Sequence, residues 1–363
     1  MTIKEICNAF LIKGKYVGCE EINTGIINST YKVTFLREGE QKCYAVQKIN
    51  KTVFKNPPEV MENMVSVTDF VRENIEKKGL STRRFVLRAF KTKEGKSYIT
   101  DEFGDYWRCV RFIKDSVTYD STDDYKIIES VGSAFGLFQN CLDGFDASTL
   151  YITIPDFHNT PKRYEALKLA IERDEKGRVA SVKKEISDLL SFEKQACLLQ
   201  TYFEEGQLPL RVTHNDTKCN NVSFDKNTGE ALAVLDLDTV MPGLIAHDFG
   251  DAIRFIANTT IEDDPDIASV NLDLGKFEAF TKGFVSQLKE SLTDFEKQTL
   301  WLGALTLTVE LAVRFLTDYI NGDVYFKVKY PGHNLDRARN QIALAKSIEK
   351  NKTKIQKIIK KYL

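Results

Sequence analysis

Asp216, Lys218 and Asn221 lie close together in the run 212–222, Val-Thr-His-Asn-Asp-Thr-Lys-Cys-Asn-Asn-Val. A carboxylate can orient a hydroxyl group and accept its proton, an amide oxygen can bind Mg²⁺, and an ammonium group can offset negative charge in a transition state. Phosphoryl transfer needs these functions, because the protein contributes mostly positioning and charge neutralisation. We predict that Asp216 and Lys218 are catalytic, that Asn221 binds a metal, and that His214 braces the loop.

A second acidic residue is expected beside Asn221. Two short apolar runs, 222–224 and 231–235, are separated by turn-forming residues and predict a β-hairpin. The hairpin would bring Asp236, which follows the second strand, back to Asn221, so that an amide and a carboxylate meet at one Mg²⁺. Strand alternation places Asp238 on the same face, where it could support the metal from further out.

The sequence also contains a literal Asp-Phe-Gly at 248–250, but we do not assign it the metal role. It lies too far from Asn221 for one tight hairpin, and it follows a loop, 241–247, and opens an apolar helix expected over 251–257. We interpret Asp248 as a helix-start carboxylate that bonds to backbone amides of the 212–222 loop.

The elements that must position these residues change character along the chain. Residues 1–113 read as strand-rich, with a hairpin formed by 31–35 and 43–49 and one helix whose apolar residues recur at helical spacing over 59–77. Further strands are expected at 85–90, 97–100 and 107–113. Apart from the 222–237 strands, the remainder reads as helical. Helices are expected at 125–138, across 162–205 with a turn at Gly177, from 251 onward, and as one basic amphipathic helix over 342–363.

This change in composition near residue 113 predicts an α+β, two-lobed chain. The domains would be 1–113, a small β-rich lobe with one helix, and 114–363, a larger α-helical lobe that holds the 212–222 loop. An isolated H-x-D-x-x-x-x-N pattern would often be an ordinary loop. The hairpin, the terminal Asp236, the Asp-rich helix start and the β-then-α order together favour the catalytic interpretation.

Three phrases resemble the aminoglycoside phosphotransferase/choline kinase-like superfamily: 214–221, Leu235-Asp-Leu-Asp238 and His247-Asp-Phe-Gly-Asp251. The phrases at 23–28, 47–50, 153–158 and 314–323 resemble, more narrowly, bacterial N-acetylhexosamine 1-kinases. The resemblance covers about residues 18–345. It implies a two-lobed protein-kinase-like fold, ATP and Mg²⁺ as cofactors, and phosphorylation of the C1 hydroxyl of N-acetylglucosamine or N-acetylgalactosamine.

A lobe of that kind covers the nucleotide phosphates with a loop between two strands. Gly25, Asn28 and the hydroxyl of Ser29 or Thr30 are the candidates, although only one glycine is present in 23–30. The strand 44–48 would supply a phosphate-binding side chain. Its alternation lets only one of Gln47 and Lys48 face the nucleotide, and we favour Lys48.

The next helix offers a partner for Lys48. Glu62 is the preferred partner and Glu59 the alternative, while both could equally be exposed residues of a surface helix. Phe112 and Ile113, at the end of the last strand of the lobe, would meet adenine at an interlobe hinge, although apolar residues at a strand end are usually core.

The acceptor site is expected in two segments. Asp156, His158 and Arg163 offer polar groups in a loop and helix start, while Glu310 and Arg314 share one helix face by i, i+4 spacing. The alternatives are a buried structural ion pair for Glu310 and Arg314 and a satisfied loop histidine for His158. Further candidates on the C-terminal side are Asp323, Tyr325 and Asn334.

Bulk properties exclude several classes of function. The net charge of −1 gives no general attraction to nucleic acid or to an anionic membrane. The 7 scattered cysteines contain no C-x-x-C pair, which argues against a zinc site or a disulfide framework. No signal peptide is expected, and no apolar run approaches the length of about 18 residues that marks a membrane span. We therefore expect a cytoplasmic protein.

Other functions stay open at this level. The acceptor could be another sugar, an amino alcohol or an aminoglycoside, although a mixture of arginines and acids suits a neutral sugar better than a cation. A non-catalytic, ATP-binding pseudokinase would not need Asp216, Asn221 and Asp236 together. A metallohydrolase is disfavoured, because the 4 histidines include no H-x-H or H-E-x-x-H arrangement.

Overall fold

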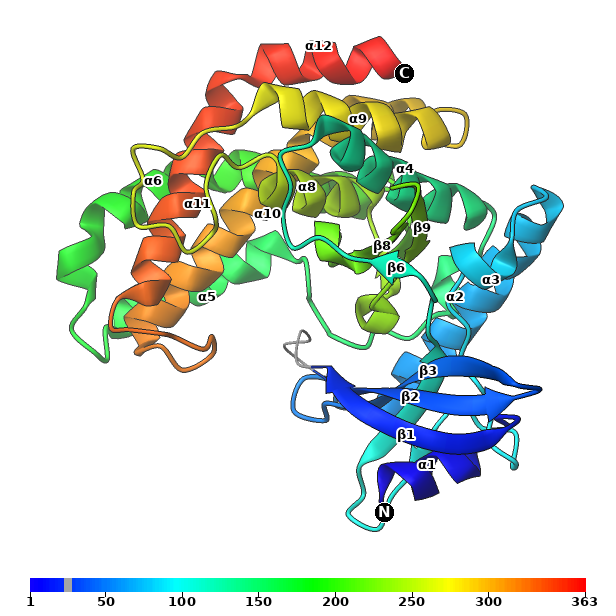
Figure 1. Cartoon of the computed structure of the whole chain (residues 1–363). Helices are drawn as coiled ribbons and strands as arrows, with labels where there is room; N and C mark the ends of the chain where they lie inside the picture. The colour runs from blue at the N-terminus through cyan, green and yellow to red at the C-terminus, as the bar shows by residue number, and fades with distance from the viewer. Residues whose placement is uncertain (23–27) are drawn as a thin grey trace. The chain divides into compact units, whose positions relative to one another are not determined.

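The computed structural model describes residues 1–22 and 28–363, which form two compact units (Figure 1). The first unit comprises Met1–Thr118, Cys141–Pro155 and Asn221–Pro242, and the second comprises Tyr119–Asn140, Asp156–Asn220 and Gly243–Leu363. The boundary expected at residue 113 lies near the end of the first of these segments. A single cut does not describe the division, because the 221–242 segment belongs with the N-terminal sheet.

An antiparallel sheet organises the first unit. Its strands are β1 (Lys15–Ile22), β2 (Ser29–Arg37), β3 (Glu40–Ile49), β5 (Tyr106–Arg111) and β4 (Ile99–Thr100), in that spatial order. Only Glu38 and Gly39 connect β2 to β3, and both have positive φ angles, 54° and 79°. A two-residue turn of this kind matches the twist of the flanking strands. The predicted hairpin is therefore confirmed, with longer strands than expected.

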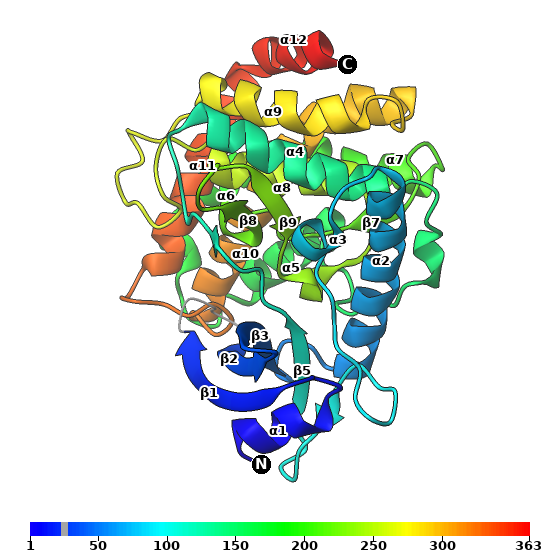
Figure 2. The ribbon, with the colours of Figure 1, turned by 45° about the vertical axis from the view of Figure 1, so that its right-hand side comes forward.

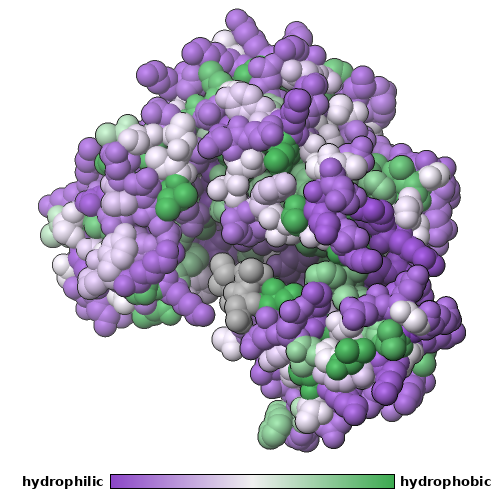
Figure 3. Space-filling model, in the orientation of Figure 1, coloured by the Kyte–Doolittle hydropathy of each residue, from purple (hydrophilic) through white to green (hydrophobic). Residues whose placement is uncertain are grey.

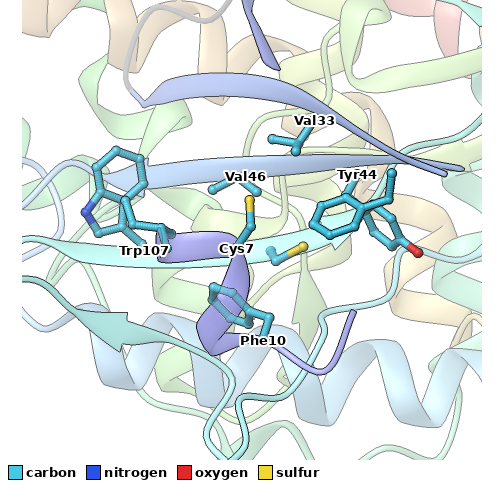
Figure 4. Packing of buried hydrophobic residues seen from close by; sticks show 9 residues of the cluster. Cys7, Phe10, Val33, Tyr44, Val46 and Trp107 are labelled. Carbon is cyan, nitrogen blue, oxygen red and sulfur yellow. The ribbon is translucent and has the colours of Figure 1, made fainter. Parts of the chain in front are cut away.

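One face of this sheet is covered by a short helix that the sequence analysis did not predict. Helix α1 (Ile3–Ala9) begins with a capping box, in which Thr2 and Glu5 exchange hydrogen bonds between side chains and backbone. Its buried residues pack on the side chains of the central strands and form a small apolar core (Figure 4). The labelled members of this core are Cys7, Phe10, Val33, Tyr44, Val46 and Trp107.

Helix α2 (Pro57–Lys77) confirms the helix predicted over 59–77. Proline suits the first turn of a helix, where its missing N–H is not needed. The predicted apolar positions Val60, Met64, Val67, Val71 and Ile75 are all buried. The other elements of the first unit are α3 (Thr82–Phe85), β6 (Ser116–Val117), η1 (Ala147–Thr149), β8 (Val222–Asp225), β9 (Ala231–Val234) and η4 (Leu237–Thr239), of which β6, β8 and β9 form a small sheet.

The strand predicted at 85–90 is wrong. Phe85 ends α3, and the following residues run as irregular chain with a single bridge between Ala89 and Val110. The strand predicted at 97–100 shrinks to the two residues of β4. Apolar runs of this length do not distinguish a strand from a connecting segment that packs against one.

The second unit is mainly helical, as expected from 114 onward. Its elements are α4 (Tyr125–Cys141, whose last residue enters the first unit), α5 (Thr160–Arg173), η2 (Val179–Val182), α6 (Lys183–Ala196), α7 (Leu198–Glu204), β7 (Arg211–Thr213), α8 (Ile245–Ile256), α9 (Leu274–Leu288), α10 (Asp294–Asn321), α11 (His333–Lys350) and α12 (Lys352–Tyr362). Two short elements cross the unit boundary, η3 (Cys219–Asn221) and β10 (Met241–Gly243). Helix α10 contacts α5, α6, α8 and α11, and α9 lies between α4 and α12 (Figure 2).

Helix α10 corrects the expectation that no apolar stretch of the chain approaches the length of a membrane span. In the described part of the chain it is the one helix that is long and apolar enough to cross a membrane by length and composition, but 83% of its apolar window is buried inside the structure. The core helix of a globular unit passes the same test, so this helix is weak evidence for a span. On the face drawn in Figure 3, most residues are hydrophilic and hydrophobic residues are scattered among them.

The predicted C-terminal helix over 342–363 is two helices. Helix α11 ends at Lys350 and α12 begins at Lys352, with Asn351 between them. The backbone N–H of Asn351 still donates to carbonyls of α11, while its own carbonyl accepts from the first turn of α12. Because helical spacing of apolar residues continues through the break, the sequence pattern could not reveal it.

Candidate active site

The loop after β7 carries Asp216 and Lys218 in direct contact. The ammonium Nζ of Lys218 lies 2.9 Å from Oδ1 of Asp216, and both side chains are about three-quarters buried. Burial alone would lower the pKa of Lys218, but the charge and hydrogen bond of Asp216 together with the charge of Asp251 outweigh it and raise that pKa above its ordinary value. Lys218 is therefore a cation at neutral pH, next to the carboxylate that the sequence singled out.

Two carboxylates of α8 accept hydrogen bonds from the backbone of this loop. Asp248 accepts hydrogen bonds from the backbone N–H groups of His214, at 2.9 Å, and Asn215, at 2.8 Å. Asp251 accepts from the backbone N–H of Thr217 at 2.8 Å. As predicted, Asp248 lies in the first turn of a helix and bonds to backbone amides of this loop. The residue at which the helix begins was predicted wrongly, since α8 begins at Ile245 and residues 245–247 are already helical.

The side chains behind these carboxylates were not predicted. Arg254 lies 2.9 Å from Asp251 and 2.5 Å from Glu262, and its guanidinium is buried. Burial by itself would raise the pKa of Asp251, but Arg254, with smaller contributions from His158 and Lys218, holds that pKa below the ordinary value. For Asp248, burial prevails and raises the pKa. The i, i+3 spacing of Asp251 and Arg254 was the sequence signal that could have suggested the first pair.

The proposed metal ligands lie at the base of the β8–β9 hairpin in the first unit. Val222 pairs with Val234, and the N–H of Leu235 donates to the carbonyl oxygen of Asn221 at 2.8 Å. The hairpin thus brings the residue before Asp236 onto Asn221, as predicted. Asp236 follows the strand, is exposed and has a left-handed backbone with φ 54°.

This donor set fits Mg²⁺. The ion prefers oxygen ligands, takes few of them from the protein and keeps water and phosphate oxygens. One amide and one exposed carboxylate at the base of a hairpin meet that description. Across residues 1–22 and 28–363, no group of three or more His, Cys, Asp or Glu side chains is arranged to hold a metal ion.

Asp238 does not lie on the strand face that alternation predicted. It belongs to the short helix η4 and is 2% exposed. Arg108 of β5 forms an ion pair with one carboxylate oxygen, and the amide Nδ2 of Asn28 donates to the other at 2.6 Å. The chain turns from strand to helix after Asp236, so alternation no longer applies to Asp238.

The residues expected at the nucleotide are spread over both faces of the sheet. Gly25 lies outside the described residues. Thr30 accepts a hydrogen bond from Gln47 at 3.0 Å. Asn28 uses both ends of its amide, because Oδ1 accepts from the backbone N–H of Asn50 at 3.0 Å while Nδ2 binds Asp238.

Lys48 and Glu62 do not pair with each other. Lys48 lies 3.3 Å from Asp105, and Glu62 accepts a hydrogen bond from Tyr151, which raises the pKa of Tyr151. Phe112 and Ile113 were expected at the end of the last strand of the lobe, but β5 ends at Arg111 and they follow it. Lys32 lies over the Phe112 ring, and the Ile113 carbonyl accepts a hydrogen bond from Ser116.

The structure brings together His158 and Glu310, which the sequence placed in separate segments. Nδ1 of His158 lies 3.0 Å from Oε1 of Glu310, whose other oxygen accepts from Thr160 at 2.8 Å. Burial would raise the pKa of Glu310, but His158, Arg314 and Thr160 together hold it at about 2. The ring of His247, which the sequence analysis did not single out, lies 5.1 Å from that of His158.

Two buried nitrogen atoms near this pair have no hydrogen-bond partner among the described residues: Nε2 of His158 and Nε of Arg163. The Nη2 group of Arg163 donates to the carbonyl oxygens of Asp156 and Phe157 at 2.8 and 2.9 Å. Burial lowers the pKa of Arg163, and Arg314 lowers it further. Buried polar atoms are nearly always hydrogen-bonded, so these two nitrogen atoms have room for partners, water or ligand, beyond the described residues.

Aromatic rings surround the second guanidinium. Arg314 lies between 5.4 and 5.9 Å from the ring centres of Phe157, Tyr325 and Phe326. The Asp156 side chain points elsewhere, since it pairs with Lys162 at the surface. Of the further candidates, Asp323 binds Arg178, and Asn334 donates to both Asp318 and Asp323.

A model described as the phosphotransferase enzyme family matches residues 18–279, which is more than half of the chain. The chain belongs to this family. The phosphotransferase is also similar to solved structures along nearly all of its length. An aminoglycoside phosphotransferase from Alicyclobacillus acidocaldarius is 10% identical, with a TM-score of 0.64 and coverage of 99% of this chain and 97% of that one.

Two further similar structures are named for acceptors that differ from each other. A spectinomycin phosphotransferase, solved with ADP and spectinomycin, is 12% identical over 93% of this chain and 94% of that one, with a TM-score of 0.55. A choline kinase from Cryptosporidium parvum is 15% identical over 96% and 93%, with a TM-score of 0.53. At such identities the matches show the fold alone. They confirm the predicted protein-kinase-like fold of the phosphotransferase, with an N-terminal sheet and a helical C-terminal part.

Proposed function

We propose that this phosphotransferase transfers the γ-phosphoryl group of ATP to the C1 hydroxyl of an N-acetylhexosamine, N-acetylglucosamine or N-acetylgalactosamine. The observation that carries the choice of a neutral acceptor is the pair of unpartnered atoms at His158 and Arg163. Nδ1 of His158 faces the Glu310 carboxylate, so that Nε2 is left for a ligand and can donate or accept according to where the ring carries its proton, while Nε of Arg163 is a donor. A hydroxyl or an amide satisfies such a pair.

The charges of the same cluster disfavour a cationic acceptor. Its carboxylate, Glu310, is already bonded to His158 and Thr160, and the guanidinium groups of Arg163 and Arg314 are close enough for Arg314 to lower the pKa of Arg163. An ammonium group brought here would meet two cations and no available carboxylate. Aminoglycosides and choline are cations, whereas N-acetylhexosamines are uncharged.

In the proposed reaction the C1 oxygen of the sugar bonds to the γ-phosphorus, the bond from that phosphorus to the β–γ bridging oxygen breaks, and ADP leaves. Asp216 orients the C1 hydroxyl and accepts its proton, and Lys218 neutralises charge on the phosphoryl group in flight. Asn221 and Asp236 would hold Mg²⁺, which supplies further charge neutralisation at the phosphates when bound.

The remaining assignments are part of the same proposal. Gly25, Asn28 and Thr30 would lie at the phosphate-covering segment. Lys48 lies on the face covered by α1, where it pairs with Asp105, and Glu62 bonds to Tyr151, so their contacts do not support the phosphate-binding pair expected from the sequence. Phe112 and Ile113 would meet the adenine. Asp156, His158, Arg163, Glu310 and Arg314 would form the acceptor site, with Asp156 serving through its backbone carbonyl, which orients Arg163.

The test is phosphorus NMR of the products formed with ATP and Mg²⁺. N-acetylglucosamine, N-acetylgalactosamine, glucose, galactose, choline and an aminoglycoside are compared side by side. We expect a product only from the sugars, best with the N-acetylated ones. Its phosphorus signal should split into a doublet, because C1 carries one hydrogen, whereas a 6-phosphate couples to two.

Other outcomes contradict the proposal in distinguishable ways. Turnover of choline or the aminoglycoside with no turnover of sugars would assign a cationic acceptor. A triplet from the sugar product would reject the C1 position. Tight ATP binding without turnover of any acceptor would identify a pseudokinase.

A further inference from the structure

The two faces of the central strands differ in chemistry. Cross-strand partners share a face, and the pairs Val46–Cys109 and Lys48–Trp107 lie on the face covered by α1 (Figure 4). Lys48 there pairs with Asp105 and lies 6.0 Å from the centre of the Trp107 ring. By alternation, the pair Gln47–Arg108 lies on the opposite face.

Arg108 is a buried cation of that opposite face, and it reaches the segment that follows the metal hairpin. Its guanidinium is 2% exposed, donates from Nε to Oε1 of Gln47 at 2.9 Å and contacts the sulfur of Met64 in α2 at 3.8 Å. From Nη1 it forms the ion pair with Asp238, which is equally buried. A buried guanidinium is costly, and it is tolerated only where its partners are well placed.

Asp238 is fixed on both sides. One oxygen is bound by Arg108 and the other by Asn28, whose own Oδ1 is held by the backbone N–H of Asn50. Gln47 is held in turn, because its Nε2 donates to Thr30 at 3.0 Å. The network joins β2, β3 and β5 to one carboxylate of η4.

A second hydrogen bond fixes the segment around η4, two residues after Asp238. The buried amide of Asn63 in α2 donates to the carbonyl oxygen of Val240 at 3.0 Å. Asp236 stands immediately before this doubly anchored segment, with the left-handed backbone conformation that non-glycine residues rarely adopt. The direction in which the Asp236 carboxylate leaves the chain is thus set by the anchors at Asp238 and Val240.

We propose that Arg108 and Asp238 are positioning residues for the metal-binding carboxylate of Asp236, acting through η4 and supported by Gln47 and Asn28. The inference rests on the proposed role of Asp236 in binding Mg²⁺. Neither residue touches the metal. Their effect is to keep Asp236 beside Asn221, so that the two ligands need no rearrangement when the ion binds. Partners that orient metal ligands in this way affect metal affinity strongly.

The test measures metal binding directly. Mn²⁺ replaces Mg²⁺ as a paramagnetic probe, and loss of the free-ion EPR signal beyond the loss that the same concentration of ADP causes without protein reports binding to the protein–ADP complex. The main variant is Arg108→Gln/Asp238→Asn, which removes both charges together and leaves side chains of similar size. A single replacement would strand one buried charge and could unfold the protein. The matched control is Arg84→Gln, since Arg84 pairs with Asp225 at the far end of β8 in the same hairpin.

We expect the dissociation constant for Mn²⁺ to rise about 10- to 100-fold in the double variant, the range found for partners of metal ligands. The control should bind as the wild type does. The KM for the sugar should change much less than the Mg²⁺ concentration needed for half-maximal rate, a split that general loss of structure would not give. Thermal unfolding shows whether the double variant folds. If it does not, Arg108→Lys takes its place, because lysine keeps the charge but cannot bond to Asp238 and Gln47 together.

The outcomes separate the two proposals. A folded variant that binds Mn²⁺ like the wild type overturns the positioning role of Arg108 and Asp238. Weak binding in the control as well would attribute the effect to the hairpin in general and would also overturn it. A wild-type protein that binds no Mn²⁺ with ADP, or a folded Asp236→Ala variant that binds it normally, contradicts the metal site of the proposed function itself.

Discussion

The carboxylate of Asp248 accepts a hydrogen bond from the backbone N–H of His214 at 2.9 Å, across 34 positions of the sequence. A second bond from Asn215 and a third from the amide of Gln139, at 2.6 Å, complete its surroundings. Since these donors converge on one buried carboxylate, the loop that carries Asp216 has its backbone fixed before any substrate binds.

Asp248→Asn tests this support. The side-chain NH₂ group of the new asparagine would face one of the N–H groups that now donate to Asp248. At least one of these donors would then be buried without an acceptor. We expect the free energy of unfolding to fall by about 1–3 kcal/mol, together with a lower kcat. Urea unfolding and steady-state rates measure the two effects. Asp188→Asn on the surface of α6, which breaks a pair with Lys346, is the control and should change neither. An unchanged kcat in Asp248→Asn would mean that the loop keeps its shape without this carboxylate.

Asp216→Asn tests the catalytic carboxylate. The amide preserves the shape of the side chain and cannot accept the hydroxyl proton. Turnover should fall about 100-fold or more, as is typical when a general base is lost, while KM for the sugar changes much less. ADP release under saturating substrates gives kcat, and thermal unfolding checks the fold. Near-normal turnover would remove Asp216 from the mechanism.

Asp236→Ala tests the metal ligand separately. Without this carboxylate, Asn221 alone remains of the proposed protein ligands, and Mg²⁺-dependent activity should disappear at all Mg²⁺ concentrations that the wild type uses. A titration of rate against Mg²⁺ measures this. Asp69→Asn on the surface of α2, which pairs only with Arg72 one turn away, should leave the titration unchanged. Retained Mg²⁺ dependence in Asp236→Ala would place the metal elsewhere.

Because His247 is buried, we expect the free energy of unfolding to fall in mild acid. Burial, and to a smaller extent the neighbouring His158, lower the pKa of His247 to about 3, against an ordinary value of 6.5. Because the folded pKa lies below the unfolded one, the unfolded state takes up a proton first. Stability is therefore complete above pH 6.5 and declines as the pH falls toward 3.

The matched variant is His247→Phe, which keeps a planar ring and cannot be protonated. From pH 7 to pH 5 the free energy of unfolding should fall by about 2 kcal/mol more in the wild type than in the variant, at 1.36 kcal/mol for each pH unit below 6.5. Urea unfolding at pH 7, 6 and 5 measures it. Parallel pH profiles for the two proteins would contradict the neutral, buried state of His247.

Gly303→Ala tests the close approach of α8 and α10. A Cβ at Gly303 would collide with the carbonyl of Ala246, and one at Gly250 would collide with the carbonyl of Gly303. Helix propensity by itself would favour alanine by roughly 1 kcal/mol, but overpacking of rigid backbone costs about 1–3 kcal/mol, so we expect net destabilisation. Gly18→Ala in β1 meets open space and serves as the control. Equal unfolding temperatures for both variants would show that the helices separate easily.

Much of the candidate site follows from the sequence, because its geometry is local. The spacing of Asp216, Lys218 and Asn221 is covalent, and the hairpin that returns the chain to Asn221 needs only two short strands and a turn. The helix-start position of Asp248 likewise follows from short-range rules for carboxylates at helix N-termini. These predictions did not depend on distant parts of the chain.

Long-range contacts were decided by tertiary structure alone. Strand alternation shows that Gln47 and Lys48 face opposite ways, but only the pairing with β5 shows that Lys48 shares a face with Trp107 and that Gln47 shares the other face with Arg108. The ion pair of Arg108 with Asp238 spans 130 positions. Packing decides which arginine is buried, and a buried arginine needs a partner because an unpaired buried charge is too costly. No rule of sequence spacing identifies such a partner from the sequence alone.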